Sequence, residues 1–228
     1  MKFYVIMKNF FLLFISIILL ASCENRDKKI QNAVSQELKG ILYDFESYEP
    51  IKTKVDSAFS SPYIDPEVKA LMYSMAKPMQ ELETAKREYN NALSSVALWD
   101  MPYSSSYSRQ QRKEAIAKRD AAKLTIENNQ AQLISVIKAL YTRIKEDETN
   151  DDKFIGWFVI QRYRCKTGGG YPSFGDDVFV FNKDITECIF YMYCEEYENL
   201  KNFVNQLLSI PEDEFLKKIE DINLLDSL

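Results

Sequence analysis

Residues 155–194 read IGWFVIQRYRCKTGGGYPSFGDDVFVFNKDITECIFYMYC, and this stretch decides the fold class. Aromatic and β-branched residues dominate three runs, 155–166, 178–181 and 185–194, and such runs favour strands. The loop Thr167-Gly168-Gly169-Gly170-Tyr171-Pro172 follows the first run, and the turn Asn182-Lys183-Asp184 separates the last two. We therefore predict an antiparallel meander of three strands.

Residues 65–149, which precede the meander, have a helical period instead. Asp65-Pro66-Glu67 is a helix start, because aspartate caps free amides and proline suits the first helical position. Ser108 and Gln111 match the capping box of a second helix, and Pro78 should kink or restart the first. Narrow apolar seams predict an antiparallel coiled-coil hairpin. The expected seam residues are Val68, Met72, Met75, Met79, Leu82, Tyr89, Leu93 and Val96, then Ile116, Leu124, Ile126, Leu133, Ile137, Leu140 and Ile144.

The remaining segments complete an α+β fold. Residues 30–43 have one apolar face at helical spacing, and residues 51–55 alternate as an edge strand after Pro50. Further helices are expected from Leu200 onward. We predict a small antiparallel sheet of about four strands, covered by the first and penultimate helices. Residues 30–64 and 150–228 form this α+β module, and the helical hairpin of residues 65–149 is inserted in it.

The amino terminus predicts export and lipidation. Lys2 and Lys8 precede an apolar run over residues 10–20, which suits a secretory signal and is shorter than the roughly 20 residues that span a bilayer. Leu20-Ala21-Ser22-Cys23 resembles the lipobox of bacterial lipoproteins, which are cut before the cysteine. The resemblance implies a signal peptide over residues 1–22, acyl chains on Cys23 and a tether over residues 23–29. Several acyl chains hold a protein at a membrane better than one. A plain signal peptide with a free Cys23 is the alternative.

Composition excludes several classes of function. The 228 residues carry a formal net charge of −5 and include no histidine. Histidine-based triads and histidine-ligated metal sites are thereby excluded. The acidic balance argues against nucleic-acid binding, which needs a basic surface. We expect no cofactor and no metal.

Two parts of the sequence together resemble a small bacterial envelope module of unknown function, which occurs in uncharacterised lipoproteins of Gram-negative envelopes. The first part is residues 42–51, LYDFESYEPI, and the second comprises residues 157–169, WFVIQRYRCKTGG, with residues 179–184, FVFNKD. Phe45 and Thr167 depart from the pattern of that group. The resemblance implies architecture only: the first strand and the last three share one sheet, with residues 65–149 inserted between them.

Two sets of aromatic residues are candidate sites. A cluster at the expected hairpin tip suggests contact with a protein partner, although Trp99 and Tyr107 could instead close the apolar end of the hairpin. The second set would line a pocket between sheet and helix for a small molecule or glycan. The tip residues are Trp99, Met101, Tyr103 and Tyr107, and the pocket residues are Trp157, Tyr163, Tyr171 and Tyr191.

The glycine loop, the cysteines and the paired carboxylates are each interpreted as structural features rather than as functional sites. The three glycines from Gly168 lie between strands, so a hairpin loop is favoured over a phosphate-binding loop. Strand spacing predicts that Cys165, Cys188 and Cys194 are free and mostly buried thiols. The paired carboxylates at 151–152, 176–177 and 195–196 are interpreted as solvated turn charges, because none has a calcium-loop pattern.

These observations lead to one expectation about function and one alternative. We expect a non-enzymatic protein, anchored by lipid in the cell envelope and in the outer membrane rather than the inner, which binds another envelope protein. The alternative is a lipoprotein that binds a small molecule or glycan. An enzyme is disfavoured, since it would need an unusual mechanism without histidine.

Overall fold

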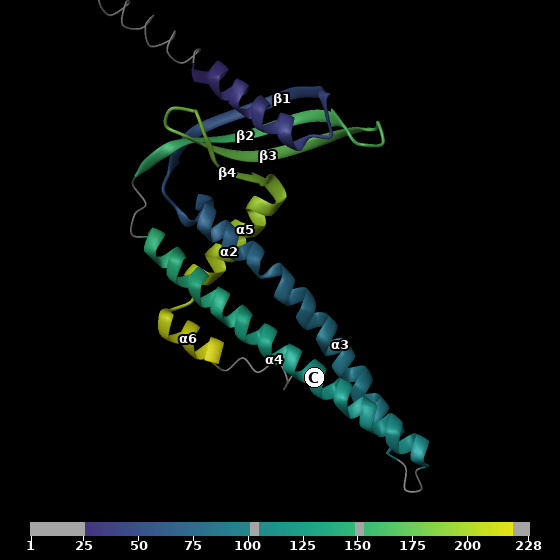
Figure 1. Cartoon of the computed structure of the whole chain (residues 1–228). Helices are drawn as coiled ribbons and strands as arrows, with labels where there is room; N and C mark the ends of the chain where they lie inside the picture. Colours follow the sequence, from purple (N-terminus) through teal and green to yellow (C-terminus); the bar gives the residue numbers. More distant parts are fainter. Residues whose placement is uncertain (1–25, 101–104, 149–152, 221–228) are drawn as a thin grey trace, which may run out of the picture. The chain divides into compact units, whose positions relative to one another are not determined.

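The computed structural model describes residues 26–100, 105–148 and 153–220, and it has an α+β fold (Figure 1). A helix over residues 26–41 opens the described chain. The elements that follow are β1 (Asp44–Phe59), the short 3-10 helix η1 (Pro62–Ile64), α2 (Pro66–Ser74), α3 (Ala76–Leu98), α4 (Ser106–Glu148), β2 (Phe154–Lys166), β3 (Pro172–Asn182), β4 (Cys188–Tyr193), α5 (Cys194–Leu208) and α6 (Glu212–Glu220). The expected signal peptide, Cys23 and the start of the tether lie outside the described residues.

The chain divides into two compact units. One unit combines Met1–Ile64 with Asn150–Asn199, and the other combines Asp65–Thr149 with Leu200–Leu228. The first boundary between the units coincides with the predicted start of the hairpin insertion, and the second with its end. The residues from Leu200 onward group with the hairpin, whereas the sequence pattern predicts them in the α+β module.

The first unit contains the four-stranded sheet, which is antiparallel throughout with the order β1-β2-β3-β4. The helix over residues 26–41, purple in Figure 1, covers one face of this sheet. Its Ile30, Val34 and Leu38 are fully buried in a cluster that includes Phe179 and Phe181. The opposite face meets the first turns of α5, where the Tyr197 ring lies 5.6 Å from that of Phe158 and 6.3 Å from that of Phe190.

The strand boundaries differ from the sequence prediction at several points. β1 begins before Pro50 and continues past residue 55, and β3 already begins at Pro172. β4 begins at Cys188 rather than at residue 185, because the turn after β3 extends through Thr186. There the Asn182 Oδ1 accepts a 2.9 Å hydrogen bond from the backbone N–H of Thr186, and Ile185 has a φ of 55°.

The second unit is built on the antiparallel pair of α3 and α4. The Asp65 carboxylate caps α2, accepting a 2.7 Å hydrogen bond from the Glu67 N–H. The helix breaks at Met75 and restarts as α3, because Pro78 offers no N–H to the carbonyl four residues earlier. The second long helix begins at Ser106. Its cap is Ser105, whose Oγ accepts from the Ser108 N–H at 3.2 Å, so the prediction of Ser108 as the cap is wrong.

The last described helix, α6, packs on α4 near Tyr141. The rings of Tyr141 in α4 and Phe215 in α6 stack with centroids 3.8 Å apart. The Tyr141 hydroxyl donates a 3.2 Å hydrogen bond to the carbonyl of Ile210. Both side chains are buried, so this stack fixes α6 to the hairpin.

Candidate functional site

The predicted seam of the hairpin is correct only in part. Six of the predicted residues are buried, namely Val68, Met75, Leu82, Ile126, Leu140 and Ile144. The sequence pattern places Met79, Leu93 and Leu124 inside it, and all three are exposed. The buried seam also contains alanines, which the sequence pattern did not place there. Counting only large apolar residues therefore misplaces part of the seam. The buried seam residues are Leu82, Ala85 and Ala92 of α3 and Ala115, Ala122 and Ile126 of α4.

Two of the four predicted tip residues are described, and the structure brings them together. The rings of Trp99 and Tyr107 meet edge to face with centroids 6.0 Å apart. Trp99 is half-buried by this contact, whereas Tyr107 is 61% exposed, as is Leu98. Met101 and Tyr103 lie outside the described residues. We call the end of the hairpin where α3 ends and α4 begins the distal end. It thus presents a fixed tryptophan beside two exposed apolar side chains.

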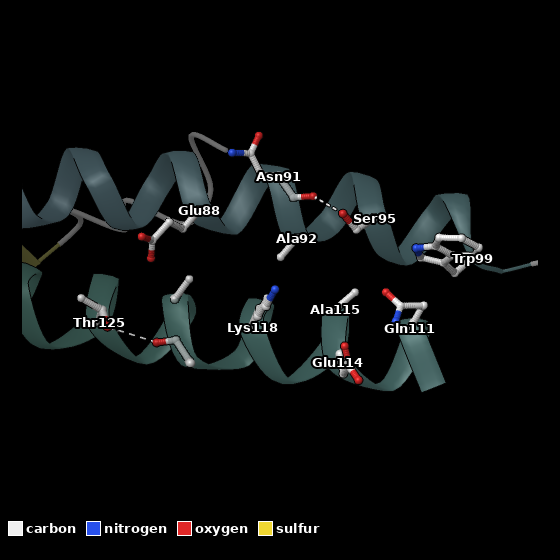
Figure 2. Close-up of a pocket in the computed structure, with 12 residues that line it drawn as sticks. Glu88, Asn91, Ala92, Ser95, Trp99, Gln111, Glu114, Ala115, Lys118 and Thr125 are labelled. Carbon is white, nitrogen blue, oxygen red and sulfur yellow. Dashed lines mark hydrogen bonds between the residues drawn. The ribbon is translucent and has the colours of Figure 1, made fainter. Parts of the chain in front are cut away.

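A groove of about 580 Å³ lies between the distal halves of α3 and α4 (Figure 2). Figure 2 shows Ala92 and Ala115 facing one another across it, with Trp99 at one end. The rim carries Glu88 and Lys118 from opposite helices. The alanines that close the seam also create this groove, since they leave the space that larger side chains would fill.

The face of the sheet that is covered by the helix over residues 26–41 carries a polar row across all four strands. Thr53, Gln161, Asp177 and Tyr193 are successive cross-strand neighbours in β1, β2, β3 and β4. Gln161 is 1% exposed and Asp177 is fully buried. The Thr53 hydroxyl donates a 2.7 Å hydrogen bond to the Gln161 Oε1, and the Gln161 Nε2 donates at 3.1 Å to the carbonyl of Arg162. Burying such groups is costly unless they are paired.

Asp177 is only partly paired. Its Oδ2 accepts hydrogen bonds from the hydroxyls of Tyr163 at 3.1 Å and Tyr191 at 3.4 Å, while its Oδ1 is buried without a partner among the described residues. Desolvation raises the pKa of this carboxyl to about 6, against the lowering effect of the two tyrosine hydrogen bonds. Desolvation and the nearby carboxylate also raise the pKa of both phenols. Because the Asp177 carboxyl has no solvent exposure and lines neither the 580 Å³ groove nor the groove beside Gln161, it is out of reach of a substrate in this structure.

A glycine positions one of these hydroxyls. Gly175 lies opposite Tyr163 in the sheet, and a Cβ on Gly175 would lie 2.3 Å from the Tyr163 ring. The ring therefore occupies the space that a side chain would take, and its hydroxyl reaches Asp177. A glycine within a strand often marks such a close approach.

The four predicted pocket residues do not line one cavity. Tyr163 is buried and Tyr191 half-buried, and they meet at Asp177. Trp157 packs at the edge of the same core cluster, where its Nε1 donates a 3.1 Å hydrogen bond to the carbonyl of Lys183. Tyr171 is exposed in the loop between β2 and β3. Tyr163 belongs to the apolar core cluster, and Trp157 and Tyr191 pack against it.

A groove of about 410 Å³ does lie beside this core, between the helix over residues 26–41 and β1. None of the four predicted residues lines it. Its floor includes Gln161, and Lys52 is the only charged residue that the described chain contributes to its lining. The other lining residues are Gln31, Asn32, Ser35, Tyr48, Pro50, Ile51 and Thr53. The sequence offered one indication of this site, because Gln161 is a polar residue within an otherwise apolar run of a strand.

The remaining predictions on reactive side chains have mixed outcomes. Cys165, Cys188 and Cys194 are free, as predicted, but they are half-buried. The Gly168 to Gly170 segment is a hairpin loop, in which Gly170 has a φ of 79°. The interpretation of Asp177 as a solvated turn charge is wrong, since it lies in β3 and faces the core. Glu195 and Glu196 lie in the first turn of α5, and Asp151 and Asp152 lie outside the described residues.

Comparisons with protein-family models, with curated proteins and with solved structures give no match. Within residues 26–100, 105–148 and 153–220, no helix has both the length and the apolar character for a membrane span. The same part of the chain has no group of three or more potential metal ligands.

Proposed function

We propose that this chain is a lipid-anchored protein of the bacterial cell envelope that binds another envelope protein through the distal end of its helical hairpin. The anchor part of the proposal rests on the sequence Leu20-Ala21-Ser22-Cys23. The binding part rests on the hairpin. A non-enzymatic role is consistent with the absence of histidine from the sequence and with the burial of the Asp177 carboxyl.

The observation that carries the binding part is the exposure of Leu98 and Tyr107 around Trp99. Both side chains are 61% exposed, and the edge-to-face contact with Tyr107 holds Trp99 in place. Large apolar and aromatic residues that are fixed before binding lose little conformational entropy on contact. α3 has 23 residues, and at a rise of about 1.5 Å per residue it is roughly 35 Å long. Besides the distal end itself, α3 therefore offers a partner a long helical surface.

The binding part is tested by replacing both exposed side chains. The double variant Leu98→Ser, Tyr107→Ser should lose a partner that co-purifies with the native protein after cross-linking. Leu124→Ser is the matched control, because Leu124 is 58% exposed on α4 away from the distal end, and it should retain the partner. Thermal unfolding of both variants checks the fold. Equal recovery of the partner with the double variant and the control would refute a contact at the distal end.

The anchor part is tested separately by mass spectrometry of the native amino terminus. We expect cleavage before Cys23 and a mass increase that corresponds to acyl chains on that residue. An unmodified Cys23, or retention of residues 1–22, would refute lipid anchoring.

A further inference from the structure

We propose that the groove between the helix over residues 26–41 and β1 binds a neutral or acidic saccharide unit. This site is on the sheet-containing unit and is independent of the hairpin contact. Its volume of about 410 Å³ is within the range of about 300–1,000 Å³ that is typical of small-molecule sites.

The chemistry of the lining indicates a ligand rich in hydroxyl groups. Amides and hydroxyls each both donate and accept hydrogen bonds, as sugar hydroxyls do. Gln31, Asn32 and Ser35 contribute such groups from the helix, and Tyr48 contributes a phenol from β1. Lys52 is the only charged residue that the described chain contributes to the lining, and none of the described residues adds a carboxylate to it. An acidic saccharide is therefore acceptable, and a cationic one is disfavoured.

The floor of the groove supplies a fixed donor. Gln161 is 1% exposed, its Oε1 accepts from Thr53, and one hydrogen of its Nε2 donates to the Arg162 carbonyl. Nε2 carries two hydrogens, and the described residues provide no partner for the second. A buried donor without a partner costs free energy, which a ligand oxygen at this position would recover. Thr53 orients the amide, so it is a positioning residue.

The experiment is isothermal titration of the full chain in a non-glycosidic detergent. The probes are the neutral disaccharides maltose and N,N′-diacetylchitobiose, the acidic digalacturonic acid and the cationic glucosamine dimer. Saturable binding of at least one neutral or acidic probe is expected, with a dissociation constant of about 1 mM or tighter. Binding of the cationic dimer alone, or of none of the four probes, would overturn the proposal.

Three variants locate the binding. Ser35→Trp should fill the groove and weaken binding at least about tenfold. Gln36→Trp is the matched control, since Gln36 is the exposed next residue of the same helix and does not line the groove, and it should bind as the native chain does. Thr53→Val keeps the β-branched shape, removes the hydroxyl that holds Gln161 and should weaken binding about fivefold. Unchanged binding by Ser35→Trp would place the ligand elsewhere and contradict the proposal.

Discussion

Replacing Asp177 by asparagine should change how the free energy of unfolding depends on pH. The pKa of this carboxyl is about 6 in the folded chain, against an ordinary value of 3.8. A difference of one in pKa corresponds to about 1.4 kcal/mol, so the ionised carboxylate costs the fold about 3 kcal/mol. The folded chain holds this proton more tightly than the unfolded chain does. The free energy of unfolding that Asp177 contributes is therefore fully present below about pH 4 and is lost as the pH rises through about 6.

The asparagine side chain in the Asp177→Asn variant cannot ionise, so the variant lacks this cost at neutral pH. The new amide group introduces a cost of its own, about 1–3 kcal/mol if the nitrogen stays unpaired, but that cost does not depend on pH. The stability of Asp177→Asn relative to the native chain should therefore rise by about 2.5 kcal/mol between about pH 4 and about pH 7.5. The surrounding titratable groups, Tyr48, Cys165, Tyr193, Cys194 and Glu196, are the same in both chains.

The assay is urea unfolding of both chains across this pH range. Asp176→Asn is the matched control, because Asp176 is the exposed neighbour on the opposite face of β3 and lies 3.9 Å from the Arg162 Nε. An exposed pair contributes about 0–1 kcal/mol, so this variant should follow the native pH profile closely. Parallel pH profiles for Asp177→Asn and the native chain would refute the account of the buried carboxyl.

Two further substitutions test the packing of each unit. Gly175→Ala should lower the free energy of unfolding by about 1–3 kcal/mol, since its Cβ would lie 2.3 Å from the Tyr163 ring, whereas Gly40→Ala meets nothing within 4 Å and should be neutral or stabilising in the same urea titration. Asp65→Ala removes a helix cap and the 2.6 Å ion pair with Arg143, so it should lower the thermal midpoint more than Glu67→Ala does. The exposed Glu67 carboxylate lies 3.2 Å from the same guanidinium, and equal shifts for the two variants would contradict the role of Asp65 as cap and ion-pair partner.

The fold class was predictable because the sequence changes period near residue 150. Helical spacing over residues 65–149 and runs of β-branched and aromatic residues over residues 155–194 are local signals, so they can be recognised without knowledge of the tertiary structure. The break before Pro78 and the turn after Asn182 were predictable for the same reason. Each depends on the conformational limits of one or a few residues.

Most of the details that were missed depend on which elements meet. Ala85 and Ala92 line the helix seam because another helix lies close to them, and their small side chains gave no apolar signal. Asp177 shares a strand face with Phe179 and Phe181 at a spacing of two, so the period places it on the buried face. Only the polarity of its side chain argued for a turn. The groove beside Gln161 could not be predicted from the sequence, because it forms only when the helix over residues 26–41 packs beside β1.

The most direct test of the proposed function is site-specific photo-cross-linking in intact cells. A benzophenone amino acid at position 107 reports on the distal end of the hairpin, and the same group at position 124 reports on an equally exposed site elsewhere on α4. We expect a discrete cross-linked envelope protein from position 107 and none from position 124. Cross-links from position 124 alone, or from neither position, would contradict a binding surface at the distal end.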